Sequence, residues 1–187
     1  MKPFSSLIVA AFFLLIAGEP TPANATPQFE LLKAVDNQDM EGIEKQLKRG
    51  VSPDTRRRSS GEPALLIAAD MGSLKVVKVL LESGANANIS DRARGESALM
   101  RRSVAGDTNM IKLLLAHGAD PNRADIGQET ALMKAVRGRK FKAAQTLLEA
   151  GADPNVQDLT GKTALEYAKL SRNRRFVRLL QEAGATY

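Results

Sequence analysis

The chain has 187 residues, a formal net charge of +6 and no cysteine, and it is long enough for one domain or one repeat array. The lack of cysteine excludes disulfides, thiol nucleophiles and cysteine metal ligands, and the single histidine, His117, excludes a zinc site made of several histidines. A basic balance of this size indicates acidic partners but carries no information about the fold.

Residues 1–25 have the features of a secretory signal peptide. A short positive start precedes an uncharged apolar run over positions 7–17, and Ala23-Asn24-Ala25 supplies a small-x-small cleavage site. An uncleaved membrane anchor is the less favoured alternative, because the run is shorter than the ~20 residues that span a bilayer. We therefore expect cleavage between Ala25 and Thr26 and a periplasmic or secreted domain of residues 26–187 with no stable membrane span.

Short segments with helical hydrophobic spacing alternate with polar loops after this point. The segment at residues 108–117 places Ile111, Leu114 and Leu115 on one helix face, because their spacing is i, i+3, i+4. Gly118 follows where a helix end favours a left-handed residue. By the same criteria we predict helices at residues 29–37, 40–49, 63–71, 74–83, 97–105, 108–117, 130–137, 141–150, 163–170 and 174–183.

The predicted helix pairs recur with a period of about 33 residues, which is typical of stacked repeats. A glycine phrase recurs at nearly equal steps, at Gly50, Gly84, Gly118, Gly151 and Gly184. A leucine recurs in phase with it, at Leu65, Leu99, Leu132 and Leu165. A short helix pair cannot bury its apolar face alone, so neighbouring copies must stack. The period predicts one domain of about five repeats, at residues 28–54, 55–90, 91–124, 125–157 and 158–187.

These phrases resemble the ankyrin repeat. GESALMRRS from Gly95 and GKTALEYAK from Gly161 are similar to the family's Gly-x-Thr-Pro-Leu-His-x-Ala-Ala motif, and the following Leu-Leu-x-x-Gly-Ala-Asp phrase matches its end. The resemblance covers roughly residues 28–187. It implies an all-α ankyrin-repeat solenoid of helix-turn-helix repeats with hairpin-like loops. In such arrays the loop tips and the ends of the inner helices line a concave face that binds proteins.

The two end copies depart from the pattern in a way that predicts capping repeats. Gln46 replaces a leucine in the first copy and Gln181 replaces one in the last. A terminal repeat has one face in water, so we expect both glutamines to face solvent.

A partner-binding face follows from the resemblance, position by position. It includes Glu62, Asp70, Met71, Arg94, Glu96, Val104, Ala105, Ile126, Gly127, Glu129, Arg137, Gly138, Leu159, Thr160, Lys162, Leu170 and Ser171, flanked by Arg56, Arg57, Arg58 and Arg92. Consecutive loop tips stand side by side in such an array, so their arginines predict a partner with an acidic surface. A solvated edge kept for solubility is the alternative interpretation.

Arg102 occupies a position where the other repeats have alanine, at Ala68, Ala135 and Ala168. One interpretation is that its guanidinium extends outward over its own stem. The other is that it pairs with a carboxylate, on this chain or on a partner.

The sequence contains no catalytic constellation and no phosphate-binding glycine motif. His117 precedes a helix-ending glycine where other copies have serine or alanine, so it is expected at the surface. With 4% aromatic residues and no tryptophan, the chain has no stacking platform for single-stranded nucleic acid. We predict no cofactor, no metal and no nucleic-acid partner.

The combined prediction is a non-enzymatic, monomeric protein-binding module in the bacterial periplasm. Envelope protection, assistance to a neighbouring enzyme and inhibition of a toxin are all compatible with it. Two alternatives remain open: a binder of an anionic envelope polymer or lipid, and an exported effector that acts on a host protein.

Overall fold

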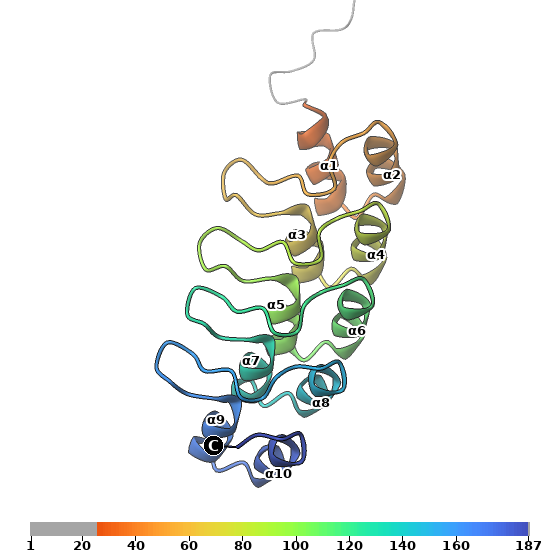
Figure 1. Cartoon of the computed structure of the whole chain (residues 1–187). Coiled ribbons are helices and arrows are strands. Elements are labelled where there is room, and N and C mark those ends of the chain that lie inside the picture. Colours follow the sequence, from red (N-terminus) through yellow and green to blue (C-terminus); the bar gives the residue numbers. More distant parts are fainter. Residues whose placement is uncertain (1–25, 187) are drawn as a thin grey trace, which may run out of the picture.

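The computed structural model describes residues 26–186, and this part of the chain contains ten α-helices (Figure 1). The helices are α1 (Pro27–Asp36), α2 (Met40–Lys48), α3 (Ala64–Asp70), α4 (Leu74–Glu82), α5 (Ala98–Ala105), α6 (Thr108–Ala116), α7 (Ala131–Arg137), α8 (Phe141–Glu149), α9 (Ala164–Leu170) and α10 (Arg174–Glu182). The predicted helices are confirmed, and each boundary agrees within two residues. The predicted signal peptide, with Ala23 and Ala25, lies outside the described residues.

The helices form antiparallel pairs that stack into a two-layered solenoid. Figure 1 shows the inner helices α1, α3, α5, α7 and α9 in one row and the outer helices in a second row, with loops projecting on one side. Three of these loops close as hairpins through isolated bridges, which join Arg56 to Pro63, Ser90 to Ser97 and Ala124 to Thr130. The predicted all-α repeat solenoid is confirmed. No helix of the described residues is long and apolar enough to cross a membrane.

The inner helices α5, α7 and α9 begin where hydroxyl side chains cap them. Ser97, Thr130 and Thr163 each accept a hydrogen bond from the backbone N–H three residues later, which satisfies a donor that the helix itself leaves free. Glu166 also accepts from the backbone N–H of Thr163, at 2.7 Å, and completes a capping box. Each of these three inner helices therefore starts directly at its hairpin.

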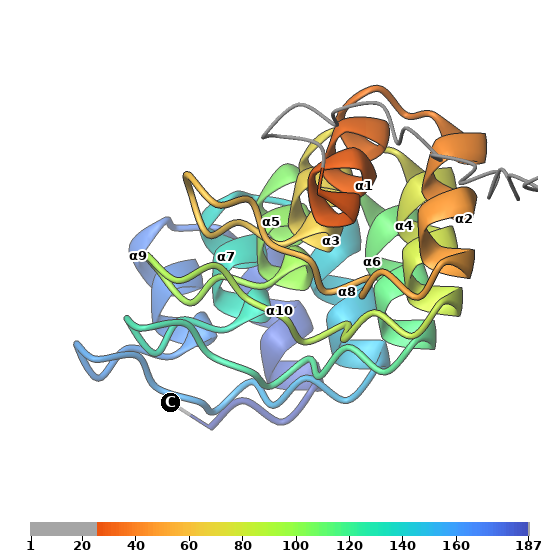
Figure 2. The same ribbon diagram turned by 90° about the horizontal axis from the view of Figure 1, so that it is seen from above.

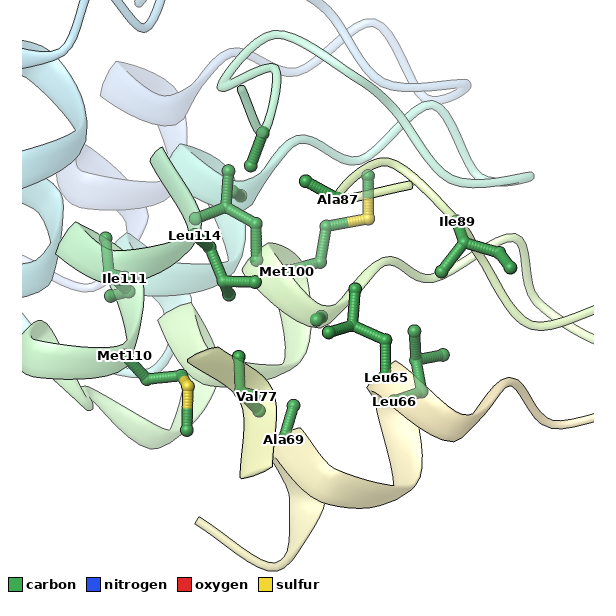
Figure 3. Close-up of a cluster of buried hydrophobic side chains, with 14 of the residues drawn as sticks. Leu65, Leu66, Ala69, Val77, Ala87, Ile89, Met100, Met110, Ile111 and Leu114 are labelled. Atoms are coloured by element: carbon green, nitrogen blue, oxygen red, sulfur yellow. The ribbon is translucent and has the colours of Figure 1, made fainter. Parts of the chain in front are cut away.

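The core runs without interruption through the stack. Figure 3 shows Leu65, Val77, Met100, Ile111 and Leu114 packed between the second and third repeats, and all five are buried. Met100 stands where the ankyrin motif has histidine. Its burial converts a polar position of the motif into core, so the hairpins must be held by other polar contacts.

One predicted capping residue is wrong. Gln181 is exposed as expected, but Gln46 is 8% exposed and its Oε1 has no hydrogen-bond partner among the described residues. Gln46 belongs to the row of Leu80, Leu114 and Leu180, which are buried in the middle and in the last repeat alike. This row faces into its own repeat, so an end repeat does not expose it.

An asparagine in each of the last three hairpin loops bonds the segment that follows the next outer helix, which is a hairpin loop for Asn88 and Asn122 and the C-terminal segment for Asn155. Asn122 donates from Nδ2 to the carbonyl of Gly151 at 3.2 Å and accepts from the Asp153 N–H at 2.7 Å. Asn88 and Asn155 repeat this pair of bonds one repeat earlier and one later. These bonds fix the spacing of neighbouring hairpins.

Candidate protein-binding surface

Polar side chains at one repeat position form a row along the inner face. Arg101, Lys134 and Tyr167 occupy the fourth position of α5, α7 and α9, one repeat period apart. Each contacts an aspartate of its own hairpin. Arg101 Nη2 lies 3.1 Å from Asp91 Oδ2, Lys134 Nζ lies 2.8 Å from Asp125 Oδ2, and the Tyr167 hydroxyl donates to Asp158. We call these six residues the inner-face ladder.

Arg101 joins carboxylates from two successive repeats. Its Nη1 is 2.8 Å from Glu62 Oε1 and also bonds Asp70, and its Nε is 3.7 Å from Glu96 Oε2. Burial lowers the pKa of Arg101, but hydrogen bonds to Glu62, Asp70 and Asp91 outweigh it and raise the pKa above its usual value. The guanidinium therefore stays charged while its side chain is only 20% exposed.

Asp91 shows the same balance from the acidic side. Burial raises its pKa, but bonds from the Arg94 backbone and from Arg101 hold the pKa below the ordinary aspartate value. The carboxylate also accepts from the Ala93 N–H at 2.8 Å, so it organises its own hairpin as well as binding the cation. The ion pair thus connects hairpin shape to the inner helix.

Lys134 repeats the arrangement one repeat later. Its Nζ lies 2.9 Å from Glu96 Oε1 and 3.3 Å from Glu129 Oε2, in addition to Asp125. Burial lowers its pKa, and the bonds to Asp125 and Glu96 overcome that effect and raise it. Glu96 contacts both Arg101 and Lys134, so it links the two clusters.

Tyr167 ends the row without a cation of its own. Burial raises the pKa of Asp158, but the Tyr167 hydroxyl and Thr160 outweigh it and hold that pKa far below the usual value. The pKa of Tyr167 is raised, mainly by its hydrogen bond to this Asp158 carboxylate and secondly by burial. Arg137 bonds Glu129 and lies 5.2 Å from the Tyr167 ring centroid. The Arg137 guanidinium and the Tyr167 ring therefore form a cation–π contact at the last position of the ladder.

The ladder engages much of the predicted binding face. Glu62, Asp70, Glu96, Glu129 and Arg137 all form ion pairs within the chain. A partner that used them would have to compete with these existing contacts.

Arg102 also pairs internally. Its Nη2 lies 2.9 Å from Asp70 Oδ1, so the interpretation that it pairs with a carboxylate of this chain is confirmed. Its Nε is buried without a hydrogen-bond partner in the described residues.

Two of the three adjacent arginines, Arg56 and Arg57, also form contacts within the chain. Arg56 Nη1 donates to the carbonyls of Gly61 at 3.0 Å and Ser90 at 2.9 Å, and Arg57 Nη2 lies 2.5 Å from Asp36. Arg57 occupies the repeat position of Asp91, and Ile67 occupies that of Arg101. Because the charge at this position is inverted in the second repeat, Arg57 pairs with an acid of the first repeat.

A second row lies at the hairpin tips and is exposed. Its members recur with the repeat period and are Arg58, Arg92, Ile126 and Leu159. Ile126 is 67% exposed and Leu159 is 73% exposed. Neither arginine forms an ion pair within residues 26–186. We call these four residues the tip row.

The side chains of Arg92 and Ile126 in the tip row lie against the preceding hairpin. A Cβ at Gly61 would lie 3.3 Å from Arg92 Cδ, and one at Gly95 would lie 3.3 Å from Ile126 Cγ2. Both glycines have a left-handed φ, of 71° and 70°. Neighbouring tips therefore form one continuous edge.

The other sequence-predicted residues lie near this edge or beyond it. Arg94 is exposed, and its carbonyl accepts from the Ile126 N–H at 3.0 Å. Lys162 is half-buried and donates to Thr160 Oγ1 at 3.0 Å. Met71, Val104 and Leu170 are exposed at the far ends or last turns of the inner helices.

A family model described as ankyrin repeats matches residues 31–125, 84–158 and 123–187. The chain belongs to the ankyrin repeat family. Arrays of ankyrin repeats serve as protein-protein interaction modules, and the family is generally non-enzymatic. No curated protein matches the chain significantly.

The single histidine of the chain lies at the end of the outer helix α6. His117 is exposed, and its Nδ1 lies 2.9 Å from the Leu113 carbonyl, in keeping with the expected surface position. No group of three His, Cys, Asp or Glu residues among 26–186 is placed to hold a metal ion.

Sequence reasoning missed Arg101, Lys134 and Tyr167 as a set. The signal was present, because these ankyrin positions stand at equal steps and the aspartates they contact recur in phase with them. Only an alignment of the repeats shows that these three polar residues share one position.

Proposed function

We propose that this ankyrin array is an exported, non-enzymatic protein-binding module of the bacterial periplasm whose partner docks along the tip row. The observation that carries the proposal is the change of chemistry along that row, from two arginines to two aliphatic side chains. The charged groups of the inner-face ladder are already paired, whereas the tip row keeps its side chains available.

The order of the tip row specifies the partner's surface. Acidic groups should face Arg58 and Arg92, and apolar groups should face Ile126 and Leu159. Stacked helices lie about 8–10 Å apart, so the row spans roughly 30 Å. Burial of the aliphatic side chains would contribute affinity, and the arginines would contribute charge-assisted hydrogen bonds and faster association.

Export is supported by the order of residues 1–25 and by the lack of cysteine, which suits an oxidising compartment. Thr26 supports the proposed cleavage position. Its side chain accepts from the Phe29 N–H at 3.2 Å and caps α1, so cleavage after Ala25 would leave the helix cap intact. In this setting the protein would act as a protective, accessory or immunity-type factor of the envelope.

Cell fractionation and intact-mass measurement test the export part. The full chain expressed in bacteria should be recovered from the periplasm with a mass that starts at Thr26. A protein that retains residues 1–25, or stays in the cytoplasm, would contradict export and leave the binding surface to be tested separately.

Affinity capture of envelope proteins tests the surface. We would compare the wild type with Arg58→Glu/Arg92→Glu, Ile126→Ser/Leu159→Ser and a control, Lys45→Glu/Lys112→Glu. The control reverses two exposed cations on the outer helices α2 and α6 that form no ion pair within residues 26–186. A partner should be captured by the wild type and the control, and its dissociation constant should rise at least about tenfold for each tip-row variant.

The salt dependence of affinity distinguishes the arginine half of the tip row from the aliphatic half. The arginine variant should lose less affinity, relative to wild type, at high ionic strength, because salt screens surface charges over ~8–10 Å. The aliphatic variant should lose the same affinity at every salt concentration. Equal binding of both variants and wild type would exclude the tip row as the docking surface.

A further inference from the structure

The turn between the two helices of each repeat contains a left-handed residue, and its identity changes along the array. Gly72 and Gly106 occupy this position with φ of 70° and 81°, whereas Arg139 and Arg172 occupy it with φ of 55° and 50°, and Gln38 fills it in the first repeat. Side chains with a Cβ adopt this conformation reluctantly, so glycine is the ordinary choice. The fourth and fifth repeats therefore carry arginine at a position where the backbone conformation favours glycine.

Further cations stand around these turns against the usual preference of helix starts. Lys140 is the N-cap of α8 and forms no capping bond with its side chain, although aspartate fills the same position at Asp39 and Asp107. Arg174 and Arg175 lie in the first turn of α10, where the helix dipole favours acidic residues. Several local preferences are thus overridden in one direction, toward positive charge.

These residues define a basic edge: Arg139, Lys140, Lys142, Lys169, Arg172, Arg174 and Arg175. None of the seven forms an ion pair with another part of residues 26–186. The first repeat carries acids around its own turn, at Asp36, Asp39 and Glu41. The turns of the second and third repeats also carry an acid, Asp70 and Asp107, so the clustered cations are confined to the fourth and fifth repeats.

The basic edge and the tip row lie at opposite ends of the inner helices. Helices α3, α5, α7 and α9 each start after a hairpin loop and end at the turn, so the two features are separated by the length of the helix. Figure 2 shows this separation, with the α1–α2 turn on the side away from the loop tips. A ligand on the basic edge would leave the tip row free.

We propose that the basic edge binds the surface of an anionic phospholipid bilayer. Clustered lysines and arginines without internal ion pairs attract anionic headgroups, and arginine forks bind phosphate through paired hydrogen bonds. A groove of about 420 Å³ between α9 and α10 is lined by Lys169, Arg172, Arg174 and Arg178, together with Val177 and Gln181. Arg178 bonds Glu182 at 2.8 Å, which leaves the other three cations to meet a headgroup phosphate.

Other anionic partners fit this edge less well. The central carbon of the Arg175 guanidinium lies 3.6 Å from the centroid of the Phe141 ring, and the Phe176 ring centroid lies 5.5 Å from it. The Phe141 ring therefore offers no open face for stacking bases. Protein interfaces are depleted in lysine, whereas three of the seven cations of this edge are lysines. Leu170 is 67% exposed beside Lys169, as expected where a side chain enters the headgroup layer.

Vesicle sedimentation of the full chain tests the proposal. The probes are phosphatidylcholine vesicles with and without phosphatidylglycerol, and neutral vesicles report any binding through the apolar segment 7–17. The main variant, Arg139→Gly/Arg172→Gly, restores the residue of the second and third repeats, so it should fold at least as well as wild type. The matched control, Lys45→Gln/Lys112→Gln, removes the same charge from the outer helices.

Wild type should bind anionic vesicles more strongly than neutral ones, and salt should weaken that preference. The glycine variant should lower the anionic partition coefficient about 25-fold, from roughly fivefold per cation near the surface. The control should change it less than about twofold, and the unfolding midpoint of the glycine variant should not fall.

Three outcomes would overturn the proposal. The first is equal binding of wild type to neutral and anionic vesicles. The second is an equal loss of binding in the control, which would indicate net charge rather than this edge. The third is edge-dependent binding to a duplex oligonucleotide or an acidic protein with no vesicle binding. Partner capture through the tip row is measured without vesicles, so the two proposals succeed or fail separately.

Discussion

Replacing Arg101 with methionine removes the cation that joins four carboxylates on the inner face. Methionine keeps the straight stem, so helix α5 should still form and pack. What changes is electrostatic: Glu62, Asp70, Asp91 and Glu96 remain gathered around a neutral side chain. The array should therefore be less stable at neutral pH.

The size of the effect follows from burial. Removing one partner of a buried ion pair costs ~3–5 kcal/mol, because the remaining charge is left uncompensated. The carboxylates around Arg101 range from 10% to 36% exposed, so water screens part of their repulsion. We expect the free energy of unfolding to fall by about 2–3 kcal/mol, between the buried and the surface limits.

The loss should depend on pH in a defined direction. The pKa of Asp91 is lowered in the folded protein, so its contribution is present above the unfolded pKa and is lost as pH falls through the folded pKa. Without Arg101 that contribution is smaller from the start. The difference between wild type and Arg101→Met should therefore be largest near neutral pH and should shrink below about pH 4.

Urea unfolding followed by circular dichroism measures both quantities. Arg94→Met is the matched control, since Arg94 is an exposed hairpin arginine without an ion pair in the described residues, and its change should stay within about 0.5 kcal/mol. Equal unfolding free energies of wild type and Arg101→Met at neutral pH would refute the reasoning. So would a difference that persists undiminished in acid.

Other contacts make separate predictions. Leu114→Ala should cost ~2–5 kcal/mol in urea unfolding through lost burial and a cavity, and Gly118→Val should lower the midpoint because its left-handed φ of 83° strains a β-branched residue. Asn122→Ala removes two bonds between neighbouring hairpins and should cost about 1–2 kcal/mol in the same assay. Tyr167→Phe should raise the pKa of Asp158, measured by carboxyl NMR titration, and should flatten the loss of stability as pH falls, because the lowered pKa stabilises only above the unfolded value.

These predictions have clear contrary results. An unchanged midpoint in both Leu114→Ala and Gly118→Val would mean that the repeat register is wrong. If Asn122→Ala matched Asn109→Ala, an exposed helical control on α6, the bonds between hairpins would contribute nothing measurable. An Asp158 carboxyl that titrates identically with and without the Tyr167 hydroxyl would show that other donors set its pKa.

The sequence by itself determined the repeat architecture. Helical spacing, glycine at helix ends and the regular repeat period are signals carried by the sequence alone, and burial of a narrow helix face leaves stacking as the only way to satisfy them. The exposed tips were predictable for the same reason, since tip positions recur in register. Arg58, Arg92, Ile126 and Leu159 needed only the repeat alignment to be placed in one row.

Tertiary structure decided which charges are available. Arg56, Arg57 and Arg58 are adjacent and chemically identical in the sequence, yet the first bonds two carbonyls, the second pairs with Asp36 and the third stays exposed. Arg101 meets Glu62 across 39 positions of the chain. Such pairs form only when stacking brings the charged groups of successive segments within about 4 Å of one another. The sequence of a single repeat does not show which groups will meet.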